Sequence, residues 1–108
     1  MTTKLETLER LAASIAVRKS AAPEESYTAK LLSQGTEKCA KKFGEEAFEL
    51  ALAAVLQDKA HTASEAADVL YHMLVLLQSA GVSLDDVMAV LRSREGSSGL
   101  VEKAARNG

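Results

Sequence analysis

The chain has 108 residues and a net charge of −2, with both signs of charge spread along it. This length is typical of one domain, here residues 1–108, and the charge excludes the basic surface that nucleic-acid binding requires. Cys39 is the only cysteine, so an internal disulfide and a cysteine-based zinc site are excluded too.

The apolar segments argue against a membrane protein. The N-terminus lacks the apolar stretch of a signal peptide. The most apolar run, residues 69–77, is too short to span a bilayer and contains His72. We therefore expect a soluble, cytoplasmic protein with no membrane partner.

The first third of the chain predicts two helices of different length. Thr3 and Glu6 fit a capping box, which predicts a helix to about Arg18. A linker around Pro23 follows. Residues 26–33 then predict a short helix that Gly35 ends.

Two long helices are predicted next. Thr36 is expected to cap the first, which runs to about Gln57. The second is expected from about Thr62 to Ser79, with Gly81 as its stop. Because the intervening turn is short, the two helices should pack antiparallel.

The last part of the chain predicts one more amphipathic helix. It should begin at Ser83 and end near Arg94, followed by a loop at 96–99 and a short helix at 100–106. Strand patterns are missing throughout. We predict an all-α fold, an antiparallel helical bundle of four to five helices that is completed by oligomerisation, because the long helices are apolar nearly all round.

Acidic side chains crowd the two long helices. Glu45, Glu46 and Glu49 fall within about 100° of arc on the first helix. Glu65 and Asp68 share a narrow stripe with two histidines on an otherwise apolar second helix. Like charges so placed repel one another. Oxygen ligands of this kind suit Mg²⁺ or Mn²⁺.

Metal binding by these acids has an alternative that the residues leave open. A single acidic motif on a helix is more often a solvated face, and Thr62 with Glu65 also fits a capping box. The pairing of two acidic clusters, Glu46 with Glu49 and Glu65 with Asp68, favours the metal site. A helical dimerisation module with a solvated acidic seam remains the competing hypothesis.

Basic and histidine residues lie beside the acids. Lys38, Lys41 and Lys42 lead into the first cluster and are candidates for binding phosphate next to the metal. His61 and His72 share the acidic stripe, where a hydrogen-bonded histidine is the favoured interpretation and metal or substrate contact the alternatives. A zinc-protease motif is absent. Cys39 is expected to be a small buried filler.

Four segments carry a resemblance to a known family. They are Ser26-Tyr27-Thr28-x-Lys30-Leu31-Leu32 with Lys42-x-Gly44-Glu45-Glu46-Ala47-x-Glu49, then Glu65-Ala66-Ala67-Asp68-x-Leu70-Tyr71-His72, and Ser98-Gly99-Leu100-x-Glu102-Lys103-Ala104-x-Arg106. Over about residues 26–106 the chain resembles phosphoribosyl-ATP pyrophosphohydrolases, which are all-helical enzymes of the MazG-like superfamily. The acidic motif alone is shared with that whole superfamily.

The resemblance implies a function and a set of site residues. It implies hydrolysis of phosphoribosyl-ATP to phosphoribosyl-AMP and pyrophosphate, the second step of histidine biosynthesis, by a homodimer or higher homo-oligomer. Mg²⁺ would be bound by Glu46, Glu49, Glu65 and Asp68. Glu45 and Glu49 are the candidate general bases. Tyr71, His72 and Arg106 are weaker candidates for binding the rest of the substrate. The alternative is a house-cleaning pyrophosphatase acting on dUTP or damaged nucleoside triphosphates.

Overall fold

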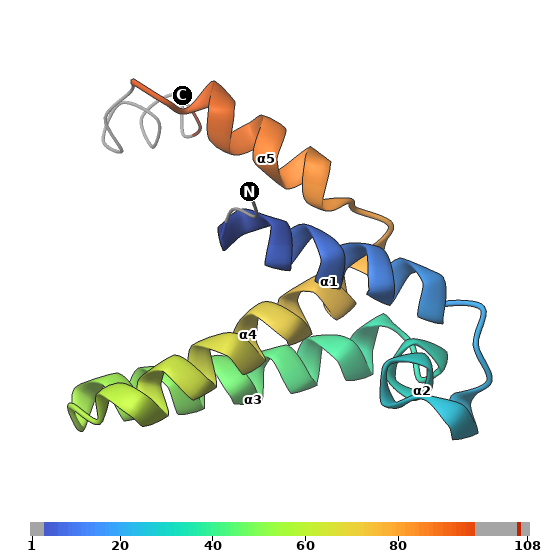
Figure 1. The fold of residues 1–108 in the computed structure, drawn as a ribbon, viewed down its shortest axis with the longest axis horizontal. Helices are drawn as coiled ribbons and strands as arrows, with labels where there is room; N and C mark the ends of the chain where they lie inside the picture. The colour runs from blue at the N-terminus through green and yellow to red at the C-terminus, as the bar shows by residue number, and fades with distance from the viewer. Residues whose placement is uncertain (1–3, 97–105, 107–108) are drawn as a thin grey trace.

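The computed structural model describes residues 4–96 and Arg106 (Figure 1). Along this part of the chain lie α1 (Lys4–Arg18), η1 (Pro23–Glu25, a 3-10 turn), α2 (Tyr27–Ser33), α3 (Thr36–Val55), α4 (Lys59–Ala80) and α5 (Leu84–Ser93). These residues contain no strand, which confirms the all-α prediction. Apart from Arg106, the helix predicted at 100–106 lies outside the described residues.

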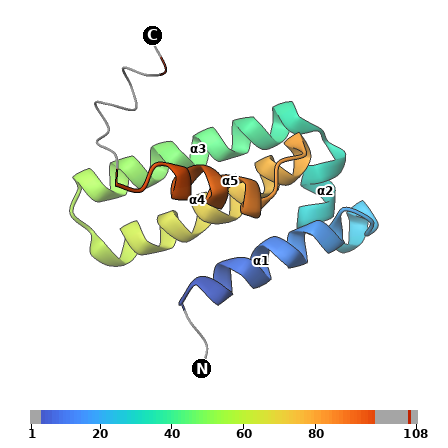
Figure 2. The ribbon, with the colours of Figure 1, turned by 90° about the horizontal axis from the view of Figure 1, so that it is seen from above.

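Helices α3 and α4 form an antiparallel hairpin and lie side by side in both ribbon views (Figures 1 and 2). The start of α3 is tied to the end of α4, because the Thr36 and Ser79 hydroxyls are 2.6 Å apart and Thr36 also donates to the Ser79 carbonyl at 3.3 Å. The predicted capping role of Thr36 is therefore wrong. Gly35, with a φ of 93°, precedes the helix and no side chain caps it.

The start of α4 differs from the prediction by one turn. The Asp58 carboxylate accepts a hydrogen bond from the backbone N–H of His61 at 3.0 Å, so the helix begins at Lys59 and not at Thr62. The Thr62 hydroxyl donates back to the Asp58 carbonyl at 2.7 Å, within the first turn. Aspartate is a strong N-cap because its carboxylate accepts from an unpaired helix N–H. The capping box that Thr62 and Glu65 could have formed is therefore absent, and Glu65 lies inside α4.

The junction between α4 and α5 follows the sequence signals. Gly81 ends α4 with a φ of 77°, a conformation that glycine adopts without steric cost. Ser83 and Asp86 then form a capping box that begins α5. No single described helix is long and apolar enough to cross a membrane; α4 and α5 meet that test only as a pair, bent by 103° at this junction.

The core lies where α1 and α2 pack against the start of α3 and the end of α4. Its buried members are Ile15, Leu31, Cys39, Leu74 and Val75. The Cys39 thiol donates to the Leu31 carbonyl at 3.4 Å, so its predicted role as a buried filler is confirmed.

The other end of the hairpin is uncovered. We call Phe48, Leu52, Val55 and Leu56 the α3 apolar face; their exposed fractions are 69%, 48%, 76% and 69%. The apolar second half of α3 predicted burial on several sides. Within the single chain one side is buried, at Ala53, and the α3 apolar face is not. The hairpin therefore offers an apolar surface at one end and a polar seam along its middle.

Candidate active site

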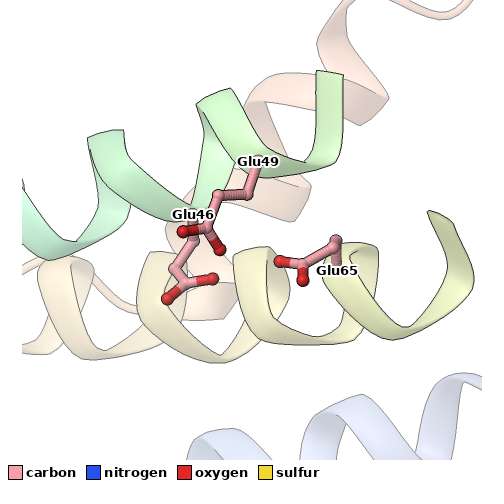
Figure 3. A group of neighbouring side chains, drawn as sticks. All are labelled: Glu46, Glu49 and Glu65. Carbon is pink, nitrogen blue, oxygen red and sulfur yellow. The ribbon is translucent and has the colours of Figure 1, made fainter. Parts of the chain in front are cut away.

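Three carboxylates converge between α3 and α4 (Figure 3). Glu46 and Glu49 lie about one turn apart on α3, and Glu65 reaches toward them from α4. Each offers one oxygen, and these three oxygens all lie within 4.8 Å of one another. Glu46 and Glu65 are half-buried, whereas Glu49 is exposed. The two predicted acidic clusters thus meet across the hairpin.

The other two predicted acids lie at the margin of this group. Asp68 is exposed and is not among the three whose oxygens converge. It is still close enough to Glu46 to raise the pKa of that carboxyl. Glu45 is exposed, and its Oε1 lies 4.0 Å from the Lys42 Nζ.

Glu46 has the most perturbed environment of the acids. Its pKa is raised, first by partial burial and then by the charges of Glu49, Asp68 and Glu65. A neutral Glu46 is one way to relieve the repulsion, and a bound cation is another.

The donor set fits a divalent cation such as Mg²⁺. Glu46 Oε2 and Glu65 Oε2 are buried and have no hydrogen-bond partner among the described residues. An orphaned buried carboxylate oxygen is costly, and coordination of a cation would satisfy it. Mg²⁺ holds oxygen ligands at about 2.1 Å, so opposite ligands are about 4.2 Å apart. The present spacing needs only small side-chain movements to reach that geometry.

A small cavity opens beside the carboxylates at the turn end of the hairpin. Its volume is about 320 Å³, and it is lined by Glu49, Leu52, Ala53, Leu56, His61 and Glu65. The His61 Nε2 lies 3.0 Å from Glu65 Oε1, so this histidine holds the carboxylate in place. His61 is therefore hydrogen-bonded, as the favoured interpretation had it.

The three predicted phosphate-binding lysines do not share one location. Lys42 lies beside Glu45 and is close enough to His72 to lower the pKa of that imidazole. Lys38 and Lys41 line a separate shallow hollow with Gln34 and Glu37. Of the three, only Lys42 is placed by these contacts next to one of the predicted site acids, Glu45.

An aromatic group, Tyr27, Tyr71 and His72, adjoins the Lys42 end of the site. His72 is buried, with 7% exposed, and packs edge-on against both tyrosine rings. Burial, followed by the charge of Lys42, lowers the pKa of the His72 imidazole. Among the described residues His72 makes ring contacts and no hydrogen bond, so the hydrogen-bonded state expected for it is wrong.

Tyr27 was not singled out as a site residue by the sequence reasoning. The signal for it was weak, a polar aromatic side chain in a chain with only two tyrosines and two phenylalanines. Its contact with Tyr71 and His72 depends on how α2 packs against α4. Arg106, the last predicted substrate residue, is exposed, and no ion pair joins it to a described acid.

Comparison with known proteins gives a consistent result. Residues 8–95 match the family described as phosphoribosyl-ATP pyrophosphohydrolase. A phosphoribosyl-ATP pyrophosphatase of Cereibacter sphaeroides is 62% identical over 99 residues, which are 92% of this chain and 96% of that protein. Proteins of the same name are 59% identical in Rhodobacter capsulatus, with 92% and 96% covered, and in Ruegeria pomeroyi, with 92% and 94% covered. This confirms the resemblance found in the sequence, and the chain belongs to the phosphoribosyl-ATP pyrophosphohydrolase family.

Proposed function

We propose that this chain hydrolyses phosphoribosyl-ATP between its α and β phosphates, giving phosphoribosyl-AMP and pyrophosphate, the second step of histidine biosynthesis. The observation that carries the proposal is the convergence of Glu46, Glu49 and Glu65 on a chain of this family, with two buried oxygens left unpaired. Such a group of carboxylates favours a bound cation, and a cation beside a lysine suits a polyphosphate.

The proposed cofactor is Mg²⁺, with Mn²⁺ as a possible substitute. Glu46, Glu49 and Glu65 would hold the ion, and Asp68 lies beside Glu46, where it would complete the set. The ion would supply positive charge to the phosphate oxygens and to the leaving pyrophosphate. All-oxygen coordination is what Mg²⁺ prefers in proteins.

The chain's own residues would position the substrate and the attacking water. Lys42, beside the carboxylates, would bind a phosphate oxygen. Glu45 and Glu49 are the candidate bases that would accept the proton of the attacking water. Glu45 lies outside the converging oxygens and stays available when Glu49 binds the ion. His61 would hold Glu65 in its orientation through their 3.0 Å contact.

The proposal includes a homodimer or higher homo-oligomer acting in the cytoplasm, in which a second copy completes the helical bundle. The α3 apolar face is exposed in the single chain, and a patch of this kind is typical of an interaction surface. The radius of gyration is 16.0 Å, whereas a compact chain of this length has about 13 Å. A chain that is less compact than usual and leaves apolar surface uncovered favours assembly.

The function is tested by incubating the purified protein with phosphoribosyl-ATP and Mg²⁺ and measuring pyrophosphate. We expect release of pyrophosphate that is lost on chelation and in Glu49→Gln. No release by folded protein would refute the proposal. Faster turnover of dUTP or other free nucleoside triphosphates than of phosphoribosyl-ATP would instead favour a house-cleaning pyrophosphatase.

A further inference from the structure

Both tyrosines of the chain lie in one small aromatic group. Tyr27 begins α2, and its ring is nearly parallel to that of Tyr71 on α4, with ring centroids 6.5 Å apart and planes 17° apart. The His72 ring stands edge-on to both, 6.4 Å from Tyr27 and 4.9 Å from Tyr71. These separations lie within the range of favourable aromatic pairs.

Two members of the aromatic group, Tyr71 and His72, are fixed by their contacts, and the third, Tyr27, is exposed to solvent. Tyr71 is half-buried, and its hydroxyl forms a 2.5 Å hydrogen bond with that of Thr28 on α2. His72 is buried. Tyr27, by contrast, is 54% exposed, and its ring is nearly parallel to that of Tyr71. An exposed aromatic face backed by fixed rings is well suited to stacking a planar ligand.

Charge links this group to the carboxylate site. His72 follows Asp68 on α4 by four residues, about 6 Å along the helix. Lys42, Asp68 and Glu45 all act on the charge of His72, and Asp68 also acts on Glu46. The aromatic group therefore adjoins the end of the site where Lys42 would bind phosphate.

We propose that the adenine of the substrate stacks on the free face of the Tyr27 ring. The identity of the base rests on the proposed function. The scissile bond would lie at Glu46, Glu49 and Glu65, the α phosphate near Lys42, and the base beyond it. Tyr27 is then a substrate-binding residue, and Tyr71 and His72 position it.

Two variants separate stacking from a merely structural role. Tyr27→Phe keeps the ring, whereas Tyr27→Leu keeps an apolar side chain and removes it. Stacking of one base changes affinity by roughly fivefold to a hundredfold. We expect Tyr27→Leu to raise the KM for phosphoribosyl-ATP about tenfold with little change in kcat, and Tyr27→Phe to behave as the unaltered protein.

Two competitive ligands provide a second readout. Adenosine monophosphate carries the base, and pyrophosphate does not. With Mg²⁺ present, calorimetry should give about tenfold weaker binding of adenosine monophosphate to Tyr27→Leu and unchanged binding of pyrophosphate. A lower melting temperature with unchanged affinity for adenosine monophosphate would show that Tyr27 only covers His72, and would overturn the inference.

The two proposals fail in different ways. If the unaltered protein releases pyrophosphate from phosphoribosyl-ATP and Tyr27→Leu matches it in KM, the stacking proposal is wrong and the proposed function stands. If the unaltered protein releases no pyrophosphate, the proposed function is wrong whatever the variants do. Equal weakening of adenosine monophosphate and pyrophosphate in Tyr27→Leu would also contradict stacking, because pyrophosphate has no base.

Discussion

Glu46 places a negative charge at a half-buried position among three other carboxylates. Because its pKa is raised in the folded protein, by burial first and by its acidic neighbours second, the fold binds a proton there more tightly than the unfolded chain does. Its contribution to stability is present in full below the unfolded pKa of about 4.3. That contribution is lost as the pH rises through the folded pKa.

Glu46→Gln tests whether the charge of Glu46 destabilises the folded protein. Without metal at pH 7 the variant should unfold with a free energy about 1 kcal/mol higher than the unaltered protein, because three like-charge contacts are removed. The difference should vanish near pH 3, more than one unit below the unfolded pKa, where Glu46 is protonated in both states. Urea denaturation at the two pH values measures it.

The same variant should respond less to Mg²⁺. A ligand that binds only the folded state raises its stability, so Mg²⁺ should raise the melting temperature of the unaltered protein and leave Glu46→Gln nearly unchanged. Glu24→Gln, which removes the same charge at an exposed position in η1, is the control and should keep the full response. A lower apo stability of Glu46→Gln at pH 7 would contradict the repulsion argument.

At the scale of the elements, α3 and α4 end in the same hydrogen-bond pattern with different residues. After α3, Gln57 N–H bonds to the Ala54 carbonyl at 3.1 Å and Asp58 N–H to that of Ala53 at 3.4 Å. After α4, Gly81 and Val82 do the same. Gln57 has a φ of 61°, and it is the only non-glycine residue with positive φ in the described part of the chain.

Replacing Gln57 should therefore stabilise the hairpin. A side chain at positive φ is strained, and glycine removes that strain at some cost in unfolded-state entropy. We expect Gln57→Gly to raise the free energy of unfolding by about 0.5–1 kcal/mol. Gly81→Ala, which meets no atom within 4 Å, should lower it by about 1 kcal/mol. Thermal or urea denaturation checks both, and a destabilised Gln57→Gly would show that the Gln57 side chain has a role of its own.

The same elements show how far sequence reasoning extends. Helical spacing and the stops at Gly35 and Gly81 predict the helices to within about one turn, because those signals are local. The caps were harder. Thr36 was misassigned because its partner, Ser79, lies 43 residues away along the chain, and Asp58 replaced Thr62 because neighbouring cap candidates compete.

The candidate site likewise contains contacts that the sequence predicts and contacts that it does not. The meeting of Glu46, Glu49 and Glu65 follows from two acidic motifs on antiparallel neighbours, so it could be predicted from spacing. The aromatic group could not, because Tyr27 reaches Tyr71 and His72 only through the packing of α2 on α4. The hollow that Lys38 and Lys41 line includes Gln34, the residue after α2, and this contact too is set by packing and not by spacing.

At the scale of the whole molecule, the α3 apolar face is the main uncovered surface of the hairpin. A charge placed there would be exposed in a single chain and buried in an assembly. Burying an unpaired charge costs several kcal/mol, so it should dissociate the assembly. In a monomeric protein the same substitution would be nearly neutral, since exposed substitutions change stability by at most about 0.5 kcal/mol.

Val55→Glu tests whether the α3 apolar face is buried between copies of the chain. Val55 is 76% exposed on the α3 apolar face, and Val17, 72% exposed on α1, provides a matched control. Light scattering coupled to gel filtration should give a dimer or larger for the unaltered protein and for Val17→Glu, but a monomer for Val55→Glu. The melting temperature should rise with protein concentration in the first two and not in the third. A monomeric unaltered protein, or an assembly that persists in Val55→Glu, would mean that this face is not the contact between copies.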